Sequence, residues 1–391
     1  MLQLQFKNFI TLQRGFDLPK KDRVLGDYPV VASTAINGYH AEHKVQPPGV
    51  VTGRSGSLGE VLYIDKPFWP LNTTLWVKDF IGNLPLYVYY FLKTLDLKQY
   101  NSGAGVPTLN RNHLDTLEIA IHDFQSQRKI ASILSAYDDL IENNLRRIKI
   151  LEEIAQALYR EWFVKFRFPG HENVQMVDSQ LGKIPDGWEV GSIGDICQVL
   201  TGFAFKSKDW SENGIPVIKI KNIRPGNLVE TEKADHVPED IIEQKHEKYY
   251  LINGDFLIAM TGATAGKVGK LRTSKQMALN QRVAKIEPTD GFYQYVWCRI
   301  SNPEAEKEFY RLADGAAQPN MSSSQIEGVS LLIPSSEVRG RFAMIVSPIL
   351  QQVDNLIFQN TTLRQTRDLL LPKLISGELD VSELEIKTGV S

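Results

Sequence analysis

The stretch SQRKIASILSAYDDLIENNLRRIKILEEIAQALYREWFVKF, residues 126–166, contains the clearest structural signal in the chain. Apolar or aromatic residues recur there at alternating steps of four and three, with one polar interruption. The positions are Ile130, Leu134, Tyr137, Ile141, Asn144, Ile148, Leu151, Ala155, Leu158 and Trp162. This spacing is typical of an a/d seam, along which two helices pack. The stretch therefore predicts a helix roughly 60 Å long at 1.5 Å per residue.

The same spacing recurs 212 residues further along the chain. Its positions are Phe342, Val346, Ile349, Val353, Leu356, Asn360, Leu363, Arg367, Leu370 and Leu374. Two seams in one chain most simply pack on each other, which predicts a pair of long coiled-coil helices. If they run antiparallel, the globular domains lie at opposite ends. Pro348 predicts either a kink or a restart of the second helix after Ser347, and Pro372 predicts a bend in its last turns. Asn144 and Asn360 either fix the register or are tolerated in a partly wet position.

The rest of the sequence is also repeated. Four pairs of segments occur in the same order: Gly15-Phe16 and Gly202-Phe203, Thr52–Gly59 and Thr261–Gly266, Leu71-Asn72 and Leu279-Asn280, and Val106–Asn110 and Gln318–Ser322. They adjoin short β-branched and aromatic runs bounded by Gly, Pro and Asn, which predict strands and turns. Each globular half is therefore predicted to be a mixed α/β domain followed by a long helix.

These patterns predict an α+β fold in which two globular mixed α/β domains are separated by two long antiparallel coiled-coil helices, with a pseudo-two-fold internal repeat. The predicted parts are a first domain (1–122), a central long helix (123–168), a linker (169–187), a second domain (188–334), a distal long helix (335–380) and a C-terminal tail (381–391).

Composition excludes several classes of protein. The chain of 391 residues is 42% hydrophobic and 23% charged, as ordinary globular proteins are. No apolar run approaches the length that a membrane helix needs, and the two cysteines fit a reducing cytosol. We therefore expect a cytoplasmic protein that does not contact a membrane. The net charge of −2 does not suggest a nucleic-acid binder, but residues 256–286 hold six basic side chains and no acidic one. Such a cluster marks either a polyanion-binding surface or a solvated loop.

The motifs of common catalytic sites are absent from the sequence. Gly262-Ala263-Thr264-Ala265-Gly266-Lys267 resembles a phosphate-binding loop, but only three residues separate its glycines and Val268 follows the lysine. The histidines lack the paired spacing of metal ligands. We therefore predict no catalytic residue, no metal and no cofactor bound by this chain.

The polar residues in the repeated loops suit DNA. Gly-rich loops expose backbone N–H groups to phosphates, and Arg, Asn, Gln and Lys side chains read base edges. Lys219-Ile220-Lys221 alternates as a strand does, so both lysines should face one side. The predicted DNA-binding residues are Arg54, Ser55, Asn72, Lys219, Lys221, Asn222, Arg224, Thr264, Lys267, Asn280, Gln281 and Arg282. The alternative for each of them is a structural role at the surface.

Four segments carry a resemblance to a known family. They are Gln127–Asn144, Ala155–Phe163, Gly182–Val190 and Leu370–Leu379. With them, essentially the whole chain resembles the specificity subunit of type I restriction–modification systems. The first domain departs from the pattern, because no counterpart of Pro185-Asp186-Gly187-Trp188-Glu189 precedes it. Its first strand is therefore predicted to be missing or different.

The resemblance implies two recognition domains that each read one half of a bipartite asymmetric site in double-stranded DNA. It implies that the long helices set the spacer between the halves and dock two methylation subunits. Those partners would carry S-adenosylmethionine and methylate adenine, and further restriction and translocase subunits would use ATP and Mg²⁺. We predict helix–helix and partner contacts at Ile130, Leu134, Ile141, Ile148, Leu151, Leu158, Trp162, Val346, Val353, Leu363, Leu370 and Leu374.

Two other functions compete with this prediction of a non-catalytic recognition subunit. A fused methyltransferase or nuclease would need catalytic motifs that the sequence lacks. A coiled-coil scaffold that binds only proteins would show no affinity for duplex DNA.

Overall fold

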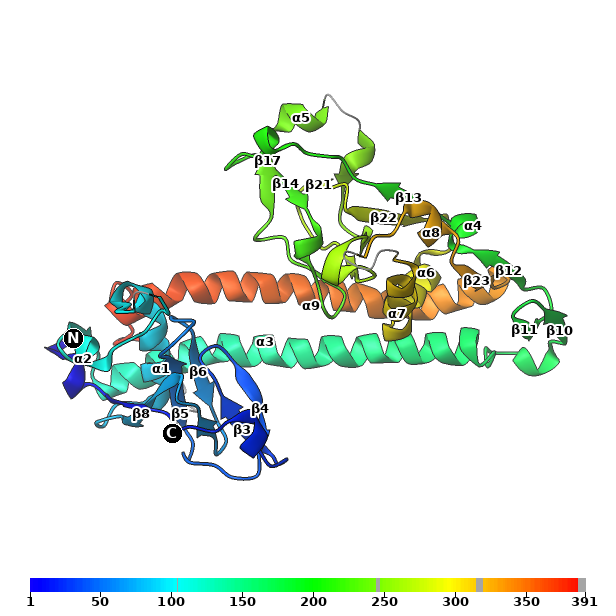
Figure 1. Cartoon of the computed structure of the whole chain (residues 1–391). Helices are drawn as coiled ribbons and strands as arrows, with labels where there is room; N and C mark the ends of the chain where they lie inside the picture. Colours follow the sequence, from blue (N-terminus) through cyan, green and yellow to red (C-terminus); the bar gives the residue numbers. More distant parts are fainter. Residues whose placement is uncertain (104, 244–246, 314–318, 386–391) are drawn as a thin grey trace. The chain divides into compact units, whose positions relative to one another are not determined.

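A computed structural model of the chain describes all residues except 104, 244–246, 314–318 and 386–391 (Figure 1). It consists of two compact units, one made of Met1–Asn143 and Asn360–Ser391 and the other of Asn144–Gln359. The two long helices, α3 (Phe124–Tyr159) and α9 (Ser336–Ser376), contribute to both units. Each unit therefore contains one globular domain and one pair of helix segments.

Both long helices form where the seam patterns predict them. Asp123 caps the first turn of α3, because its carboxylate accepts hydrogen bonds from the Ser126 backbone N–H and hydroxyl at 3.0 Å. A π-helical turn, Arg160–Val164, ends this helix. The second helix continues without a break through Pro348 and Pro372, so the predicted alternative of a restart after Ser347 is wrong.

The two helices pack antiparallel within each unit. In the first unit, the Asn360 side chain donates to the Ile141 carbonyl at 3.4 Å, and His122 contacts the Ile375 carbonyl at 3.2 Å. In the second unit, Ile148 packs with Val353 and Leu356, and the Trp162 and Phe342 rings lie 5.7 Å apart. All twelve predicted contact residues are buried or half-buried. Asn144 and Asn360 are buried as well.

The described residues of the first unit form three small sheets. Their strands are β1 (Leu2–Gln5), β2 (Thr11–Arg14), β3 (Tyr28–Val31), β4 (Ile36–His40), β5 (Gly49–Gly53), β6 (Val61–Ile64), β7 (Trp69–Pro70), β8 (Thr74–Asp79) and β9 (Glu118–Ile121). The strand orders are β2-β8-β5-β6, β4-β3-β7 and β1-β9. Two helices, α1 (Pro85–Thr94) and α2 (Arg111–Asp115), accompany them. The core of this unit includes Phe9, Tyr87 and Phe91, together with Ile130 and Leu374 of the long helices.

The second unit is larger. Its strands are β10 (Met176–Ser179), β11 (Gly182–Pro185), β12 (Glu189–Ser192), β13 (Cys197–Thr201), β14 (Ile215–Ile218), β15 (Ile223–Arg224), β16 (Leu228–Val229), β17 (Asp235–Val237), β18 (Tyr250–Leu251), β19 (Phe256–Ala259), β20 (Val268–Lys270), β21 (Met277–Leu279), β22 (Val283–Pro288) and β23 (Ser330–Ile333). Its shorter helices are α4 (Ile193–Ile196), α5 (Glu239–Glu243), α6 (Tyr293–Ile300), α7 (Pro303–Leu312) and α8 (Ser323–Glu327). The residues predicted as a linker, 169–187, contain the β10–β11 hairpin, and Ile184 of that hairpin packs into the core with Phe168 and Trp188.

Sheet topology shows that the two domains are copies of one design. The order β2-β8-β5-β6 reappears as β13-β22-β19-β20 within the second domain's larger sheet. β3 pairs antiparallel with β4 and parallel with β7, and β14 pairs in the same way with β17 and β21. This agreement confirms the predicted internal repeat. It also corrects one expectation, because β1 pairs with β9 as β12 pairs with β23, so the first strand is present.

Candidate nucleic-acid interface

Four equivalent backbone hydrogen bonds build one loop cluster in each domain. In the first domain, Gly15 donates to Thr74, Arg54 to Thr73, Leu109 to Arg54 and Gly56 to Pro107, at 2.8–3.1 Å. In the second domain, Gly202 donates to Val283, Met260 to Arg282, Met321 to Met260 and Gly262 to Pro319, at 2.9–3.3 Å. The matching ladders make Arg54 equivalent to Met260 and Thr73 equivalent to Arg282.

This equivalence corrects the alignment of the repeats. Leu71 corresponds to Asn280 rather than Leu279, and Ser55 corresponds to Thr261. The sequence match was shifted by one residue at the first position and by three at the second. The sequence match depends on similar residue types, whereas the hydrogen-bonded register decides which residues occupy equivalent positions.

Gly15 and Gly202 explain why the Gly-Phe pairs are repeated. A Cβ atom on Gly15 would overlap the backbone carbonyl of Leu71, and one on Gly202 would overlap that of Leu279. The following residues, Phe16 and Phe203, each donate their backbone N–H into the same crossing at 2.8 Å. Only glycine permits two backbone segments to approach so closely.

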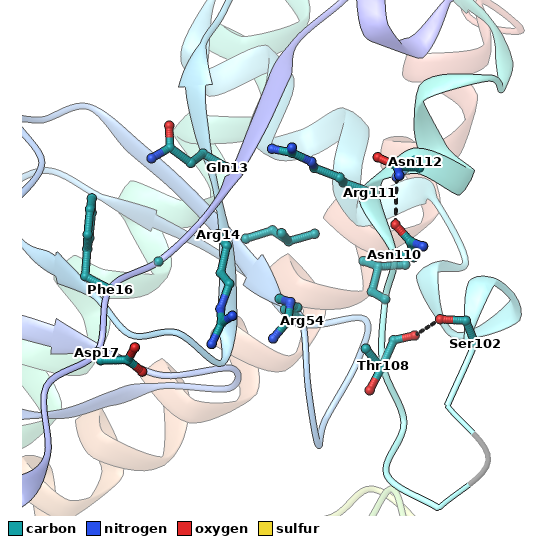
Figure 2. A pocket seen from close by; sticks show the side chains of 13 residues that line it. Gln13, Arg14, Phe16, Asp17, Arg54, Ser102, Thr108, Asn110, Arg111 and Asn112 are labelled. Carbon is teal, nitrogen blue, oxygen red and sulfur yellow. Dashed lines mark hydrogen bonds between the residues drawn. The ribbon is translucent and has the colours of Figure 1, made fainter.

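In the first domain, this loop cluster surrounds a hollow of about 730 Å³ (Figure 2). Its lining residues are Gln13, Arg14, Gly15, Phe16, Asp17, Arg54, Leu75, Ser102, Thr108, Leu109, Asn110, Arg111 and Asn112. Three arginines and a single carboxylate line it, so its charge favours an anionic ligand or the acceptor atoms of a base. We call this space the first hollow.

Contacts within the domain hold part of this lining in place. The Arg54 guanidinium donates to the Asn72 carbonyl at 3.3 Å, and Arg111 donates to the Leu12 carbonyl at 3.2 Å. The Asn72 amide donates to the Asp17 carboxylate. Arg14 is exposed and, among the described residues, its side chain has no partner. The hollow therefore combines positioned arginines with one that is free to contact a ligand.

Two of the three arginines were not predicted. Arg54 lines the hollow, whereas Ser55 and Asn72 lie beside it and shape its loops. Arg14 directly precedes the repeated Gly15-Phe16, and Arg111 directly follows the repeated Val106–Asn110 segment. Adjacency to the repeated motifs was the signal that could have identified them.

In the second domain, the equivalent loops surround a hollow of about 430 Å³ lined by Met260, Thr261, Gln281, Arg282 and Asn320. We call this the second hollow. It contains two predicted residues, Gln281 and Arg282, both exposed. No acidic side chain pairs with the Arg282 guanidinium in the part of the chain that the structure describes. Arg282 of the second hollow thus occupies the place of Thr73, whereas Arg54 of the first hollow occupies the place of Met260.

Four predicted DNA-binding residues lie in a different turn and have partners there. Lys219 and Lys221 both contact the Asp235 carboxylate at 2.8 Å, and these contacts hold the pKa of Asp235 below its usual value. Arg224 donates two hydrogen bonds to Glu230, at 2.9 and 2.7 Å, which lower the pKa of that carboxyl group. The segment Ile220–Asn222 is a 3-10 turn, so the predicted strand is wrong although both lysines do face one side.

The structure contradicts the predicted DNA contact of Asn222. Its side chain is buried, accepts a hydrogen bond from the Lys219 backbone N–H at 3.0 Å and donates to the Glu230 carbonyl at 2.9 Å. A side chain with both ends satisfied inside the fold cannot read a base edge. Asn280 is similarly buried, and its oxygen accepts from the Arg282 backbone N–H at 3.3 Å, so it shapes the loop that presents Arg282.

Thr264 and Lys267 lie in the turn around Gly262–Thr264, beside the second hollow. The Thr264 hydroxyl donates weakly to the Thr261 carbonyl at 3.5 Å. Lys267 is half-buried as a residue and, within the described part of the chain, its amine has no acidic partner. Both positions therefore stay candidates for a phosphate contact.

Only half of the basic cluster in residues 256–286 is available to a polyanion. Lys270 and Arg272 pair with Asp354 of α9 at 2.6 and 2.7 Å, and Lys285 contacts Glu287 at 3.3 Å. Lys267, Lys275 and Arg282 are the cluster's other cations. Part of the charge that suggested DNA binding therefore serves to join the domain to a helix.

The structure contains little that suits catalysis. Among the residues it describes, no group of His, Cys, Asp and Glu side chains could hold a metal ion. Burial raises the pKa of the Cys197 and Cys298 thiols to about 12, so neither is ionised at neutral pH. No described helix is long and apolar enough to cross a bilayer.

Comparison with known proteins places these features in a family. A family model described as "Type I restriction modification DNA specificity domain" matches residues 5–154 and 185–365. The type I restriction enzyme MjaIX specificity subunit of Methanocaldococcus jannaschii is 30% identical over 328 residues, covering 81% of this chain and 74% of the relative. The HindI specificity subunit of Haemophilus influenzae is 24% identical over 390 residues, covering 82% and 84%. The fold is shared with the crystal structure of a type I restriction–modification system S subunit from M. genitalium, with a TM-score of 0.61, 17% identity and coverage of 97% and 96%.

Proposed function

Because the chain belongs to the family of type I restriction–modification DNA specificity subunits, we propose that each of its two domains reads one half of a bipartite, asymmetric DNA site. The chain is a recognition subunit and not itself an enzyme. One observation carries the proposal. The same four backbone hydrogen bonds build a hollow in each domain, but different side chains line the two hollows. A shared frame with different polar groups suits the reading of two different short sequences.

The chemistry of the two hollows supports major-groove contacts. Arg pairs bidentately with guanine O6 and N7, and Asn and Gln pair with adenine. Arg14 and Arg54 supply guanine-reading groups to the first hollow. In the second hollow, Arg282 can read guanine, and Gln281 and Asn320 can read adenine. Each such pair contributes about 1–3 kcal/mol of discrimination against a wrong base.

The long helices present apolar side chains that suit partner subunits. Ile150 and Ile154 of α3 and Met344 of α9 are exposed, as is Leu369 in the other unit. We propose that these exposed side chains help to dock two methylation subunits, which would carry S-adenosylmethionine, in a cytoplasmic complex with restriction and translocase subunits that use ATP and Mg²⁺. A scaffold that binds only proteins would dock partners but would not shift duplex DNA in a gel, alone or with the methylation subunit.

Exchanging residues 1–122 for the matching domain of a relative tests the proposal. We expect one half of the methylated motif to change and the other half to stay the same, because each hollow is built within its own domain. Methylome sequencing of cells that carry the hybrid complex would measure this. The reciprocal exchange of residues 188–334 is the control and should change only the other half. A hybrid in which both halves change would exclude separate reading by the two domains.

Substitution of Arg282 tests the second hollow. We expect Arg282→Ala to weaken binding of the cognate site by about 1–3 kcal/mol and to relax preference at one position of one half-site. The melting temperature should not change, because the guanidinium is exposed and pairs with no acidic group in the described part of the chain. Fluorescence anisotropy of the assembled complex with cognate and singly substituted duplexes measures both quantities.

Lys267→Ala is the matched comparison for Arg282→Ala. It should weaken binding to all sequences alike and lower the slope of log affinity against log salt by about 0.9, the value for one lost phosphate contact.

A lower melting temperature with unaltered sequence preference in Arg282→Ala would instead show that Arg282 stabilises the fold.

A further inference from the structure

A buried charge cluster joins the second domain to the long helices. The Asp354 carboxylate of α9 accepts from the Lys270 amine at 2.6 Å and from the Arg272 Nε at 2.7 Å. Glu152 of α3 is close enough to Arg272 and Asp354 for their charges to influence its pKa. The domain thus supplies the cations of this cluster and the helices supply the anions, so the cluster acts across the surface between them.

Because the cluster is buried, its charged groups are stable only in an arrangement that keeps them paired. The side chains of Lys270 and Arg272 are 5% and 6% exposed, and that of Asp354 is 19% exposed. Burial lowers the pKa of Lys270 and raises that of Glu152, because it disfavours the charged form of each group. Buried ion pairs add little net stability, but breaking one leaves an uncompensated charge. An apolar contact tolerates sliding, whereas one carboxylate held by two directional donors permits essentially one arrangement.

Strands connect this cluster directly to the second hollow. Lys270 lies opposite Phe256 in the β19–β20 pair, and Met260, which lines the hollow, follows the other end of β19. The intervening strand is about 13 Å long at 3.3 Å per residue. A rotation of the domain by about 15° at the cluster would therefore move the hollow by roughly 3.4 Å, one base-pair step along DNA.

The first domain is attached to its helices by different chemistry. There the Asp138 carboxylate of α3 accepts from the Tyr90 hydroxyl at 2.6 Å and pairs with Arg367 of α9. Among the described residues, the group that the domain contributes to this contact is the neutral phenol of Tyr90. Among the contacts described, only the second domain therefore binds a helix carboxylate with two cations, Lys270 and Arg272.

We infer that Asp354 is a positioning residue that, through Lys270 and Arg272, holds the second domain at one angle on the long helices and thereby restricts the complex to one spacer length between half-sites. This inference rests on the proposed reading of a bipartite site. It adds a second determinant of spacing, the angle of a domain, to the length of the helices.

The test measures methyl transfer by the complex of this chain with its methylation subunits. The substrates are duplexes that carry both half-sites with the native spacer or with one base pair more or less. We expect Asp354→Asn to reduce the preference for the native spacer about tenfold while the recognised bases stay the same. Asp354→Glu, which keeps the charge, should retain more of that preference. Glu337→Gln, which removes an exposed acid from the same helix, is the matched control and should behave as the unmodified chain.

Several outcomes would overturn the inference. An equal loss of activity on all three spacers, with a lower melting temperature, would mean that the cluster is only structural. If Asp354→Asn does not fold, the combined change Lys270→Met, Arg272→Met, Asp354→Leu and Glu152→Gln removes every charge of the cluster and should also relax the spacer. Retention of the native preference by this combined variant would show that packing alone sets the angle. Failure of the proposed function is distinguishable, because the unmodified complex would then show no dependence on the spacer at all.

Discussion

Removal of one heptad from each long helix, residues 141–147 of α3 and 357–363 of α9, is expected to move methylation to DNA sites with a shorter spacer. Seven residues account for about 10 Å of helix, so the spacer should shorten by about 3 bp at 3.4 Å per base pair. Both seams keep their alternation of four and three across the junctions. The deleted residues spare Asp138, Arg367 and Asp354, so each domain keeps its attachment to the helices.

Methylome sequencing of cells that carry the shortened complex would report its spacer directly. Deletion from α3 alone is the control, since it would put the two seams out of register and should abolish activity. An active double-deletion complex that still requires the original spacer would contradict a ruler role for the helices.

Gly202→Ala is expected to destroy recognition of one half-site and to destabilise the second unit. The new Cβ would overlap the carbonyl of Leu279, a backbone atom that cannot move without breaking the hydrogen bond from Phe203 at 2.8 Å. Overpacking of this kind costs about 3 kcal/mol, which corresponds to a fall of roughly 6–12 °C in melting temperature for a unit of about 200 residues. Calorimetry and DNA-binding assays would measure the two effects.

The repeat provides a matched pair for this experiment. Gly15→Ala should produce the same loss in the first domain and affect the other half-site. Gly340→Ala is the control, because no neighbouring atom meets a Cβ there and the position lies inside α9. It should leave recognition unchanged and stabilise the helix by up to about 1 kcal/mol. A Gly202→Ala chain with unchanged binding and melting temperature would mean that the crossing of the two loops is not required.

The sequence was sufficient for the long helices, the internal repeat and the family. A seam such as Ile130 to Trp162 depends on the spacing of apolar residues along one helix, and local periodicity encodes that spacing completely. The repeated Gly15 and Gly202 could be recognised for a similar reason, because a close backbone crossing leaves no choice of residue. The presence of two mixed domains followed from similar local signals, whereas the antiparallel direction of the helices is fixed by contacts between distant residues, such as Asn360 with Ile141.

Only the tertiary structure decided which polar side chains are available to DNA. Asn222 and Lys221 are neighbours in sequence, yet the first is buried with both ends bonded and the second pairs with Asp235. Arg14 and Arg111 line one hollow although they lie 97 positions apart in the sequence, and Lys270 pairs with Asp354, which lies 84 positions further on. The physical reason is that a charged or amide group is free to read DNA only if packing brings it no internal partner. Those partners come from distant segments, whose approach depends on the register of the sheets and not on the local sequence.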